Sequence, residues 1–206
     1  MFLAIDTSAG TSVAIVDVQG VVRAECDSAD TRKHAEVIGD FIYGCLTDAG
    51  ITVTDLTGVV AGMGPGPFTG LRVGIVAART FAFGAGLPIY PVVTHDAIAF
   101  GEIEPVLIAT DARRAEFYWS TYSGMDDVGL PLRAAGPALT TAAELAAHVP
   151  NFEHYVLRET PTVRAAKLAA LAQLMKTHNR DFAGEEALYL RSPDISVSAG
   201  PKRVTA

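Results

Sequence analysis

Basic residues are the first thing that this sequence is short of. Its 206 residues include 16 Lys and Arg against 23 Asp and Glu, which gives a formal net charge of −7. Lys and Arg are adjacent only in pairs, at Arg32–Lys33, Arg113–Arg114 and Lys202–Arg203. Neutralisation of phosphates by Lys and Arg supplies most of the affinity for a nucleic-acid backbone. If RNA is involved, we therefore expect another protein to hold it, so that this chain meets RNA only indirectly.

Cysteine and histidine are too few to mark a familiar reactive site. The two cysteines, Cys26 and Cys45, are expected to be buried thiols, because a chain that is 50% hydrophobic can build a core without a disulfide. The five histidines include no His-xxx-His or His-Glu-xx-His spacing, which disfavours a helix-borne metal site and a metalloprotease. No Gly-x-Ser-x-Gly elbow marks a nucleophile. We expect no metal, no cofactor and no catalytic residue.

Long apolar runs are also missing. Charged residues interrupt the most apolar stretch, 59–100, at Arg72 and Arg79, long before about 20 clean residues accumulate. The N-terminal apolar run has no basic flank and stops at Asp6, unlike a secretory signal. These absences predict a soluble, cytoplasmic protein with no membrane segment.

What is present is a series of short strands and apolar-faced helices. Strands are expected at Phe2–Ile5, Ser12–Val18, Val21–Cys26, Gly58–Gly62, Ile89–Val93, Val106–Ala109 and Glu116–Tyr122. Helices are expected at Lys33–Ala49, Phe68–Ala85, Thr140–Val149 and Thr162–His178, with Pro161 at the start of the last. The polar segment Ser192–Ala206 is expected to be disordered.

The second half of the chain begins as the first half does. An apolar run ends at Asp6 in the first half and at Asp111 in the second, and each is followed by a polar turn and a returning strand. Two copies of a hairpin-plus-helix unit predict a duplicated α/β fold with two lobes. The lobes are expected at 1–104 and 105–206, although one repeated hairpin can also arise by chance.

The most distinctive stretch is a loop rich in glycine and proline, GMGPGPFTGLR, at 62–72. Between a strand and a helix, Gly64 and Gly66 can aim backbone N–H groups at an anion. The alternative is a tight turn in which glycines let two elements approach closely. The loop lacks the Lys-Ser/Thr ending of a P-loop, and its prolines remove donors.

The helix after this loop has a small residue at every fourth position, namely Gly70, Gly74 and Ala78. Such spacing makes a flat face on which another helix can lie. The helix is apolar nearly all round, so it needs cover on every side. A partner surface and a fully buried position both satisfy that need.

Asp6 and Asp111 are the candidate carboxylates of a cleft between the lobes. In one interpretation they hold a metal or a phosphate-linked water, as in a small-molecule kinase or ATPase. In the other they only form turns at strand ends. With no third ligand in view, the sequence leaves both interpretations open.

Several motifs in fixed order resemble the TsaB (YeaZ) family. They are LAIDTS at Leu3–Ser8, His34 at the first helix, GMGPGPFTGLRVGI at Gly62–Ile75, ATDARRAEFYW at Ala109–Trp119 and YLR at Tyr189–Arg191. The resemblance implies the two-lobe fold of actin, sugar kinases and Hsp70, in the ribonuclease H-like class. It also implies a non-catalytic subunit, and not a working protease, for N6-threonylcarbamoyladenosine formation in tRNAs that read codons beginning with A.

The resemblance further implies protein partners. These are a TsaD-like transferase subunit that the chain activates, a TsaE-like ATPase, and a second copy of the chain when it is alone. Family members pair through the first two long helices. The interface residues implied here are Ile38, Phe41, Ile42, Cys45, Gly70, Val73, Gly74, Ala77, Ala78 and Phe81. Leucine at Gly70 and Gly74 is expected to abolish pairing and leave the monomer folded.

The chain departs from the family pattern in two places. Pro67 stands where members usually have serine, which removes a hydroxyl and a backbone donor and weakens a phosphate role for the loop. The segment 150–164 is short where members usually carry an additional strand and loop. Enclosure of a nucleotide by the second lobe is therefore not expected.

Overall fold

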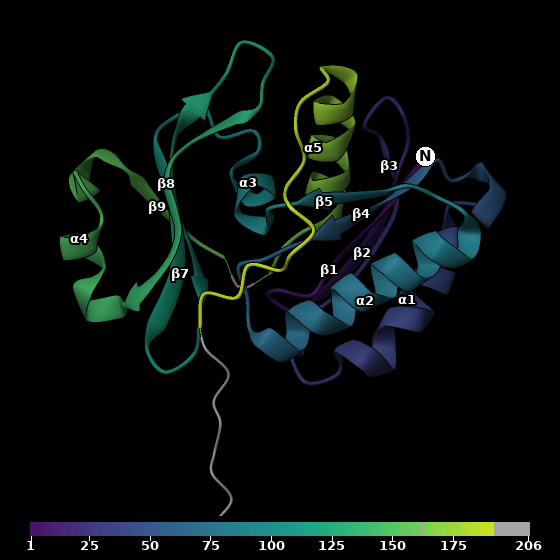
Figure 1. Ribbon diagram of the computed structural model, residues 1–206, viewed down its shortest axis with the longest axis horizontal. Coiled ribbons are helices and arrows are strands. Elements are labelled where there is room, and N and C mark those ends of the chain that lie inside the picture. The colour runs from purple at the N-terminus through teal and green to yellow at the C-terminus, as the bar shows by residue number, and fades with distance from the viewer. Residues whose placement is uncertain (161, 192–206) are drawn as a thin grey trace, which may run out of the picture.

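The computed structural model describes residues 1–160 and 162–191. Over these ranges the chain forms two sheets that lie side by side, each with helices packed against it (Figure 1). The segment 192–206, expected to be disordered, and the helix start expected at Pro161 both lie outside the described residues.

The first sheet has the strand order β3-β2-β1-β4-β5. Its strands are β1 (Phe2–Asp6), β2 (Thr11–Val16), β3 (Val22–Ser28), β4 (Gly58–Gly62) and β5 (Ile89–Val92). β1 pairs antiparallel with β2 and parallel with β4, and all of its residues are buried. Leu3 and Ile5 belong to one core cluster, while Phe2 and Ala4 belong to another. Cover on both faces explains why this strand is a continuous apolar run.

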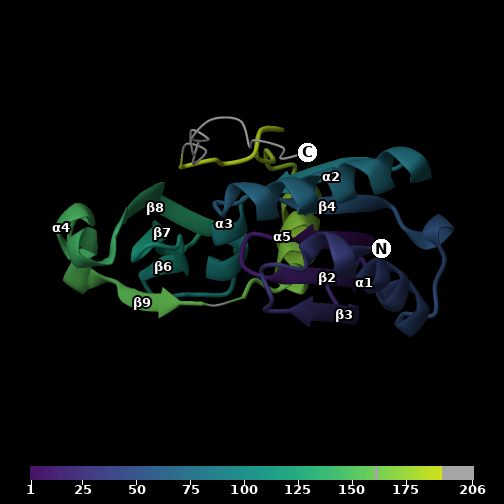
Figure 2. The same cartoon turned by 90° about the horizontal axis from the view of Figure 1, so that it is seen from below.

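Helices cover both faces of the first sheet. α1 (His34–Asp48) and α2 (Phe68–Ala85) lie side by side on one face, as Figures 1 and 2 show. α5 (Ala165–Thr177) packs on the opposite face, where Leu168 and Leu171 are fully buried. This helix was grouped with the second half of the chain, and its contacts instead complete the core of the first sheet.

The second sheet has the order β8-β7-β6-β9 and repeats the first four strands of the other sheet. Its strands are β6 (Val106–Asp111), β7 (Glu116–Met125), β8 (Pro131–Thr141) and β9 (Val156–Glu159). β9 runs parallel to β6, as β4 runs parallel to β1. The duplicated hairpin and the two-sheet α/β fold are therefore confirmed.

Short helices fill the space around the second sheet. α3 (Thr94–Ala99) lies between this sheet and α5, and α4 (Leu145–His148) packs on the far face (Figure 2). Single turns of 3-10 helix occur at η1 (Val53–Asp55), η2 (Ala142–Glu144) and η3 (Phe152–His154). The sequence pattern did not predict α3, which is too short to show a helical period.

Two expectations about the second half are wrong. The helix expected at Thr140–Val149 is a strand end, a 3-10 turn and the short α4, because β8 continues through Thr141 in its pairing with β7. The additional strand expected to be missing from 150–164 is present as β9, held by its pairing with β6. In both places hydrogen bonding to a neighbouring strand decides the structure, and local preference does not.

Candidate functional site

The carboxylate of Asp6, one of the two candidate cleft acids, is sealed inside the protein. Its Oδ1 accepts hydrogen bonds from the backbone N–H of Ser8 at 2.8 Å and from the Ser8 hydroxyl at 2.5 Å. Its Oδ2 accepts one from the Thr94 hydroxyl at 2.7 Å. Burial raises the pKa of Asp6, although these hydrogen bonds oppose the rise. Both oxygens thus hold the turn and α3 in place, which leaves Asp6 poorly suited to a metal or a nucleotide.

Thr7, the next residue, is inserted into helix α2. Its hydroxyl donates to the carbonyl of Gly70 at 2.7 Å and accepts from the N–H of Gly74 at 3.0 Å. These two backbone groups, four residues apart, are the pair that an uninterrupted α-helix would join directly. A Cβ on Gly74 would lie 2.1 Å from the Thr7 hydroxyl, so the helix comes this close only because the position is glycine.

The glycines of the loop 64–66 also serve close packing. Gly64 has φ +88 and exchanges hydrogen bonds with Thr94, donating its N–H to the hydroxyl at 3.1 Å and accepting the Thr94 N–H at 2.8 Å. A Cβ on Gly66 would lie 2.7 Å from the Cβ of Ser8. Of the two interpretations of this loop, these contacts support the tight turn. Gly66 also reaches the edge of the cleft described below.

Asp111 ends β6 as Asp6 ends β1, but it is exposed. Its Oδ1 accepts the backbone N–H of Arg113 at 2.8 Å. The contact holds the turn between β6 and β7, in which Arg113, Arg114 and Ala115 all have positive φ. The two candidate carboxylates therefore occupy equivalent places in the duplicated fold, and both act in turns.

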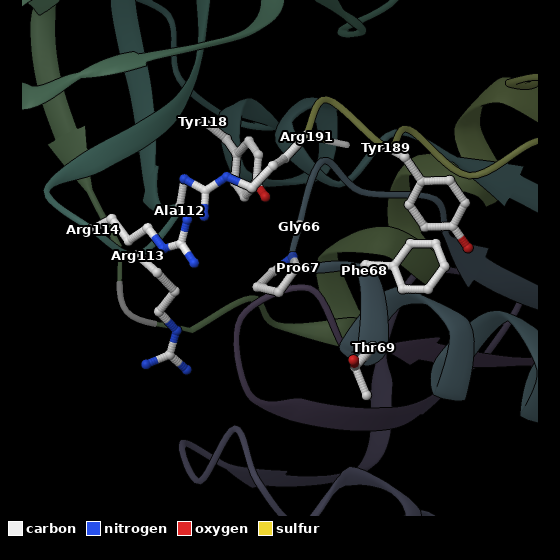
Figure 3. A pocket seen from close by; sticks show the side chains of 10 residues that line it. All are labelled: Gly66, Pro67, Phe68, Thr69, Ala112, Arg113, Arg114, Tyr118, Tyr189 and Arg191. Atoms are coloured by element: carbon white, nitrogen blue, oxygen red, sulfur yellow. The ribbon is translucent and has the colours of Figure 1, made fainter. Parts of the chain in front are cut away.

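A cleft of about 500 Å³ lies between the two halves of the chain. Figure 3 shows three arginine side chains on one side of it and the rings of Phe68 and Tyr189 on the other, with Pro67 between them. The arginines are Arg113, Arg114 and Arg191. Thr69, Ala112 and Tyr118 complete the lining together with Gly66. The sequence analysis did not predict this cleft, because its residues come from three distant segments.

The segment after α5 reaches the cleft from behind. It runs along the first sheet, where the Ala183 N–H donates to the Pro91 carbonyl at 3.0 Å and the Leu188 N–H donates to the Met63 carbonyl at 2.9 Å. At its end Arg191 forms an ion pair with Glu116 of β7. The YLR motif at 189–191 thus joins the first sheet to the second.

The expected partner face is wrong for the residues that the chain itself buries. Gly70 packs on the Thr7 carbonyl, Gly74 packs on the Thr7 side chain, and both positions face inward. The other buried members of the set are Ile38, Cys45 and Ala78. Because the obstacles at Gly70 and Gly74 include backbone, leucine there is expected to unfold the monomer rather than to block a partner alone.

The outward faces of α1 and α2 nevertheless carry large apolar side chains. Phe83 is 90% exposed, Tyr43 is 73% exposed and Val76 is 58% exposed. Val76 and Phe83 are seven residues apart and therefore share one face of α2. The remaining members of the expected set are half-buried beside this face, and they are Phe41, Ile42, Val73, Ala77 and Phe81. We call Tyr43, Val76 and Phe83 the outer apolar face.

The two cysteines differ in their surroundings. Cys45 is fully buried and its thiol donates to the Val13 carbonyl at 3.3 Å, and burial raises its pKa to about 12. Cys26 is only half-buried, so the expectation of a buried thiol is wrong for it. Both are free thiols.

His95 of α3 is a buried link between α3 and the second sheet. Its Nδ1 lies 2.8 Å from the Ser120 hydroxyl and its Nε2 lies 3.0 Å from the Thr110 hydroxyl. Burial, with Arg133 nearby, lowers the pKa of His95 to about 3. The neutral ring can donate to one hydroxyl and accept from the other, which satisfies both nitrogens.

Comparison with known proteins agrees with this geometry. The family model described as TsaD: tRNA N6-adenosine threonylcarbamoyltransferase matches residues 21–198. The chain is 38% identical over 201 residues to an uncharacterized protein of Mycobacterium tuberculosis, covering 93% of this chain and 92% of that protein. It is 37% identical over 125 residues to the tRNA threonylcarbamoyladenosine biosynthesis protein TsaB of Escherichia coli, covering 58% of this chain and 54% of that protein. The chain belongs to the TsaB/YeaZ family.

A solved structure gives the same fold for this TsaB-family chain. YeaZ from Pseudomonas aeruginosa superposes with a TM-score of 0.73 at 24% identity, covering 93% of this chain and 99% of that one. The expected actin-like, two-lobe fold is thus confirmed. Within residues 1–160 and 162–191, no three His, Cys, Asp or Glu side chains gather as a metal site would require. In the same ranges, no helix has the length and apolar character needed to cross a bilayer.

The contact between Thr7 and Gly74 predicts a coupled effect of substitutions on stability. Thr7→Ala removes two buried hydrogen bonds and should cost about 1–3 kcal/mol of unfolding free energy. Gly74→Ala places a Cβ against the Thr7 hydroxyl and should cost a similar amount or more. The double variant should be more stable than the sum of the two losses by about 1 kcal/mol, since the truncated Thr7 makes room for the methyl group. Urea unfolding measures all four proteins.

Gly84→Ala is the matched control on the same helix. A Cβ at Gly84 meets nothing within 4 Å, so alanine there should raise stability by about 0.5–1 kcal/mol. Equal effects of alanine at Gly74 and Gly84, or strictly additive losses in the double variant, would show that Thr7 does not lie in α2 as described.

His95 predicts a pH dependence of stability. The folded protein keeps the ring neutral down to a pKa of about 3, whereas the unfolded chain protonates it below about 6.5. Lowering the pH from 6.5 to 5 therefore favours the unfolded state, by up to about 1.4 kcal/mol per pH unit from this residue. His95→Gln should remove that part of the slope, and the same substitution at the exposed His178 is the control. Identical slopes for the wild type and His95→Gln would contradict a neutral buried ring.

Proposed function

We propose that this TsaB-family chain takes part in N6-threonylcarbamoyladenosine biosynthesis on tRNAs that read codons beginning with A. It acts in the cytoplasm as a non-catalytic subunit that binds and activates a TsaD-type transferase. Membership in the TsaB/YeaZ family and the similarity to a named TsaB protein support this role. A TsaE-like ATPase cycles on the pair, and the chain forms a self-dimer when the transferase is absent.

The observation that carries the proposal is the outer apolar face. Phe83 at 90% exposure and Tyr43 at 73% exposure lie on adjacent helices of a chain whose core is otherwise closed. Burying one large apolar side chain in an interface contributes about 1–3 kcal/mol. The half-buried residues beside them on α2, Val73, Ala77 and Phe81, would extend the contact area without unfolding either helix.

The sealed state of Asp6 argues for a subunit and against the rival enzyme. A kinase or ATPase would need Asp6 or Asp111 free to meet a metal-bound phosphate. Asp6 is buried with both oxygens hydrogen-bonded, and Asp111 accepts a backbone N–H in an exposed turn.

Substitution of the outer apolar face tests the proposal. Val76→Ser with Phe83→Ser should weaken association with the TsaD-type subunit at least about tenfold, because two apolar contacts are lost at the interface. Both residues are exposed, so the monomer should stay folded. Light scattering after gel filtration measures the association. Nucleoside mass spectrometry of tRNA from a depleted and complemented host measures the modification.

The matched control is Ile103→Ser with Leu132→Ser, which removes two exposed apolar side chains from other elements. That variant should pair and support the modification as the wild type does. Undiminished pairing of the folded α2 variant would remove the proposed face, and unchanged modification after depletion of the wild-type chain would remove the proposed pathway.

A further inference from the structure

Folding brings together arginines that the sequence keeps apart. Arg113 and Arg114 stand in the turn between β6 and β7, while Arg191 arrives at the end of the segment that follows α5. All three line the 500 Å³ cleft, on the same side of it in Figure 3. A chain with a net charge of −7 thus has a locally basic wall at the junction of its two sheets.

The charge of this wall is only partly compensated. Arg191 pairs with Glu116, whereas the guanidinium of Arg113 donates to the neutral hydroxyl of Thr31. The carboxylate of Asp111 is engaged by the backbone N–H of Arg113 at 2.8 Å. Among the described residues that line the cleft, none carries a carboxylate. An anion entering the cleft would therefore meet positive charge and no opposing acid on its walls.

The opposite wall is aromatic. The rings of Phe68 and Tyr189 lie with their centroids 4.8 Å apart, and the guanidinium of Arg72 lies 4.9 Å from the Phe68 centroid. Tyr189 keeps 41% of its surface exposed. An aromatic face opposite guanidinium groups is the combination that holds an unpaired nucleotide, since the base stacks and the phosphate is neutralised.

We propose that this cleft binds an unpaired stretch of the tRNA, with backbone phosphates against Arg113 and Arg114 and a base stacked on Tyr189. The proposal rests on the proposed function, because the substrate of that pathway is an RNA. It also replaces the expectation that the chain meets RNA only indirectly. That expectation counted adjacent basic residues, and adjacency cannot show arginines from distant segments that share one wall.

Two other occupants fit less well. A nucleoside triphosphate needs a ligand for its magnesium ion, and no described lining residue offers a carboxylate. An acidic peptide would use the arginines but would leave the exposed face of Tyr189 without a stacking partner. An RNA strand uses both walls.

The first test removes the two charges of the turn in the full complex with the TsaD-type subunit. Arg113→Ala with Arg114→Ala should weaken binding of a fluorescently labelled tRNA about tenfold or more. The slope of log Kd against log salt concentration should fall by about 1 to 2, since each lost phosphate contact lowers it by about 1. Arg113→Lys with Arg114→Lys keeps the charges and should retain the slope. Wild-type affinity and slope in the double alanine variant would overturn the proposal, as would absence of tRNA binding by the wild-type complex.

The matched control is Arg158→Ala with Arg180→Ala, which removes the same charge from exposed ion pairs with Glu102 and Asp126. It should leave the salt slope within about 0.5 of the wild type. An equal fall in the control and in the Arg113/Arg114 variant would mean that only net charge matters, and the site would be dismissed.

The second test separates stacking from charge. Tyr189→Leu should weaken tRNA binding about three- to tenfold at every salt concentration without changing the slope, and Tyr189→Phe should bind as the wild type does. Tyr189→Leu that binds as tightly as Tyr189→Phe would overturn the stacking role. Titration with ATP and magnesium that displaces the tRNA from the wild-type complex, but not from the Arg113/Arg114 variant, would assign the cleft to a free nucleotide instead.

Light scattering of each variant with the TsaD-type subunit keeps this inference distinct from the proposed function. The Arg113/Arg114 variant should pair normally, because neither residue belongs to the outer apolar face. Normal pairing with unchanged tRNA binding would sink only the RNA site. Loss of pairing in the Val76/Phe83 variant, with tRNA modification intact, would sink only the proposed partner role.

Discussion

The hydroxyl of Thr7 stands inside helix α2, between a carbonyl and an N–H that the helix would otherwise pair with each other. The contact fixes the end of β1 against the first turns of the helix. It requires glycine at Gly70 and Gly74, since a Cβ at either would meet Thr7 at 2.6 Å or less. The small-residue face of α2 is therefore the imprint of one threonine, and not a surface kept free for another protein.

The neighbours of Thr7 extend the same arrangement. Asp6 holds Thr94 of α3, and Ser8 is covered by Gly66 of the glycine-proline loop. Three consecutive residues at one strand end thus fix α2, α3 and the loop relative to the sheet. The region where an enzyme of this fold would handle phosphate is filled by internal hydrogen bonds. What remains open to ligands is the neighbouring cleft, and what remains open to proteins is the outer side of the helix pair.

Much of the fold could be predicted from the sequence because its signals are local. The alternation around β1 and β2, the helical spacing of α1 and the breaks around α2 are all written in neighbouring residues, and α2 was predicted to the residue. β8 and β9 could not be predicted in the same way. β8 contains alanine, glycine and two prolines, and it is a strand because β7 pairs with it. Pairing with a distant strand has no signature inside the segment itself.

The candidate site divides along the same line. Asp6, Asp111, Gly64 and Gly66 could be found as motif residues, but their roles could not, because burial and hydrogen-bond partners depend on distant segments. The partner face was placed on the correct pair of helices in outline, but on the wrong side of α2, since spacing alone cannot tell an inward face from an outward one. Tyr189 and Arg191 belonged to a recognised motif, and only the fold shows that they stand beside Arg113 and Arg114.

The return of α5 to the first sheet sets a limit on how this duplicated protein can have arisen or be divided. Residues 165–177 supply one whole side of the core around Phe2, Ala4 and Val60. A gene fragment ending at the midpoint would encode a complete sheet with one face bare. The two halves therefore share a repeated topology without being separable modules, and any ancestor made of a single copy must have covered that face with something else, such as a second copy of itself.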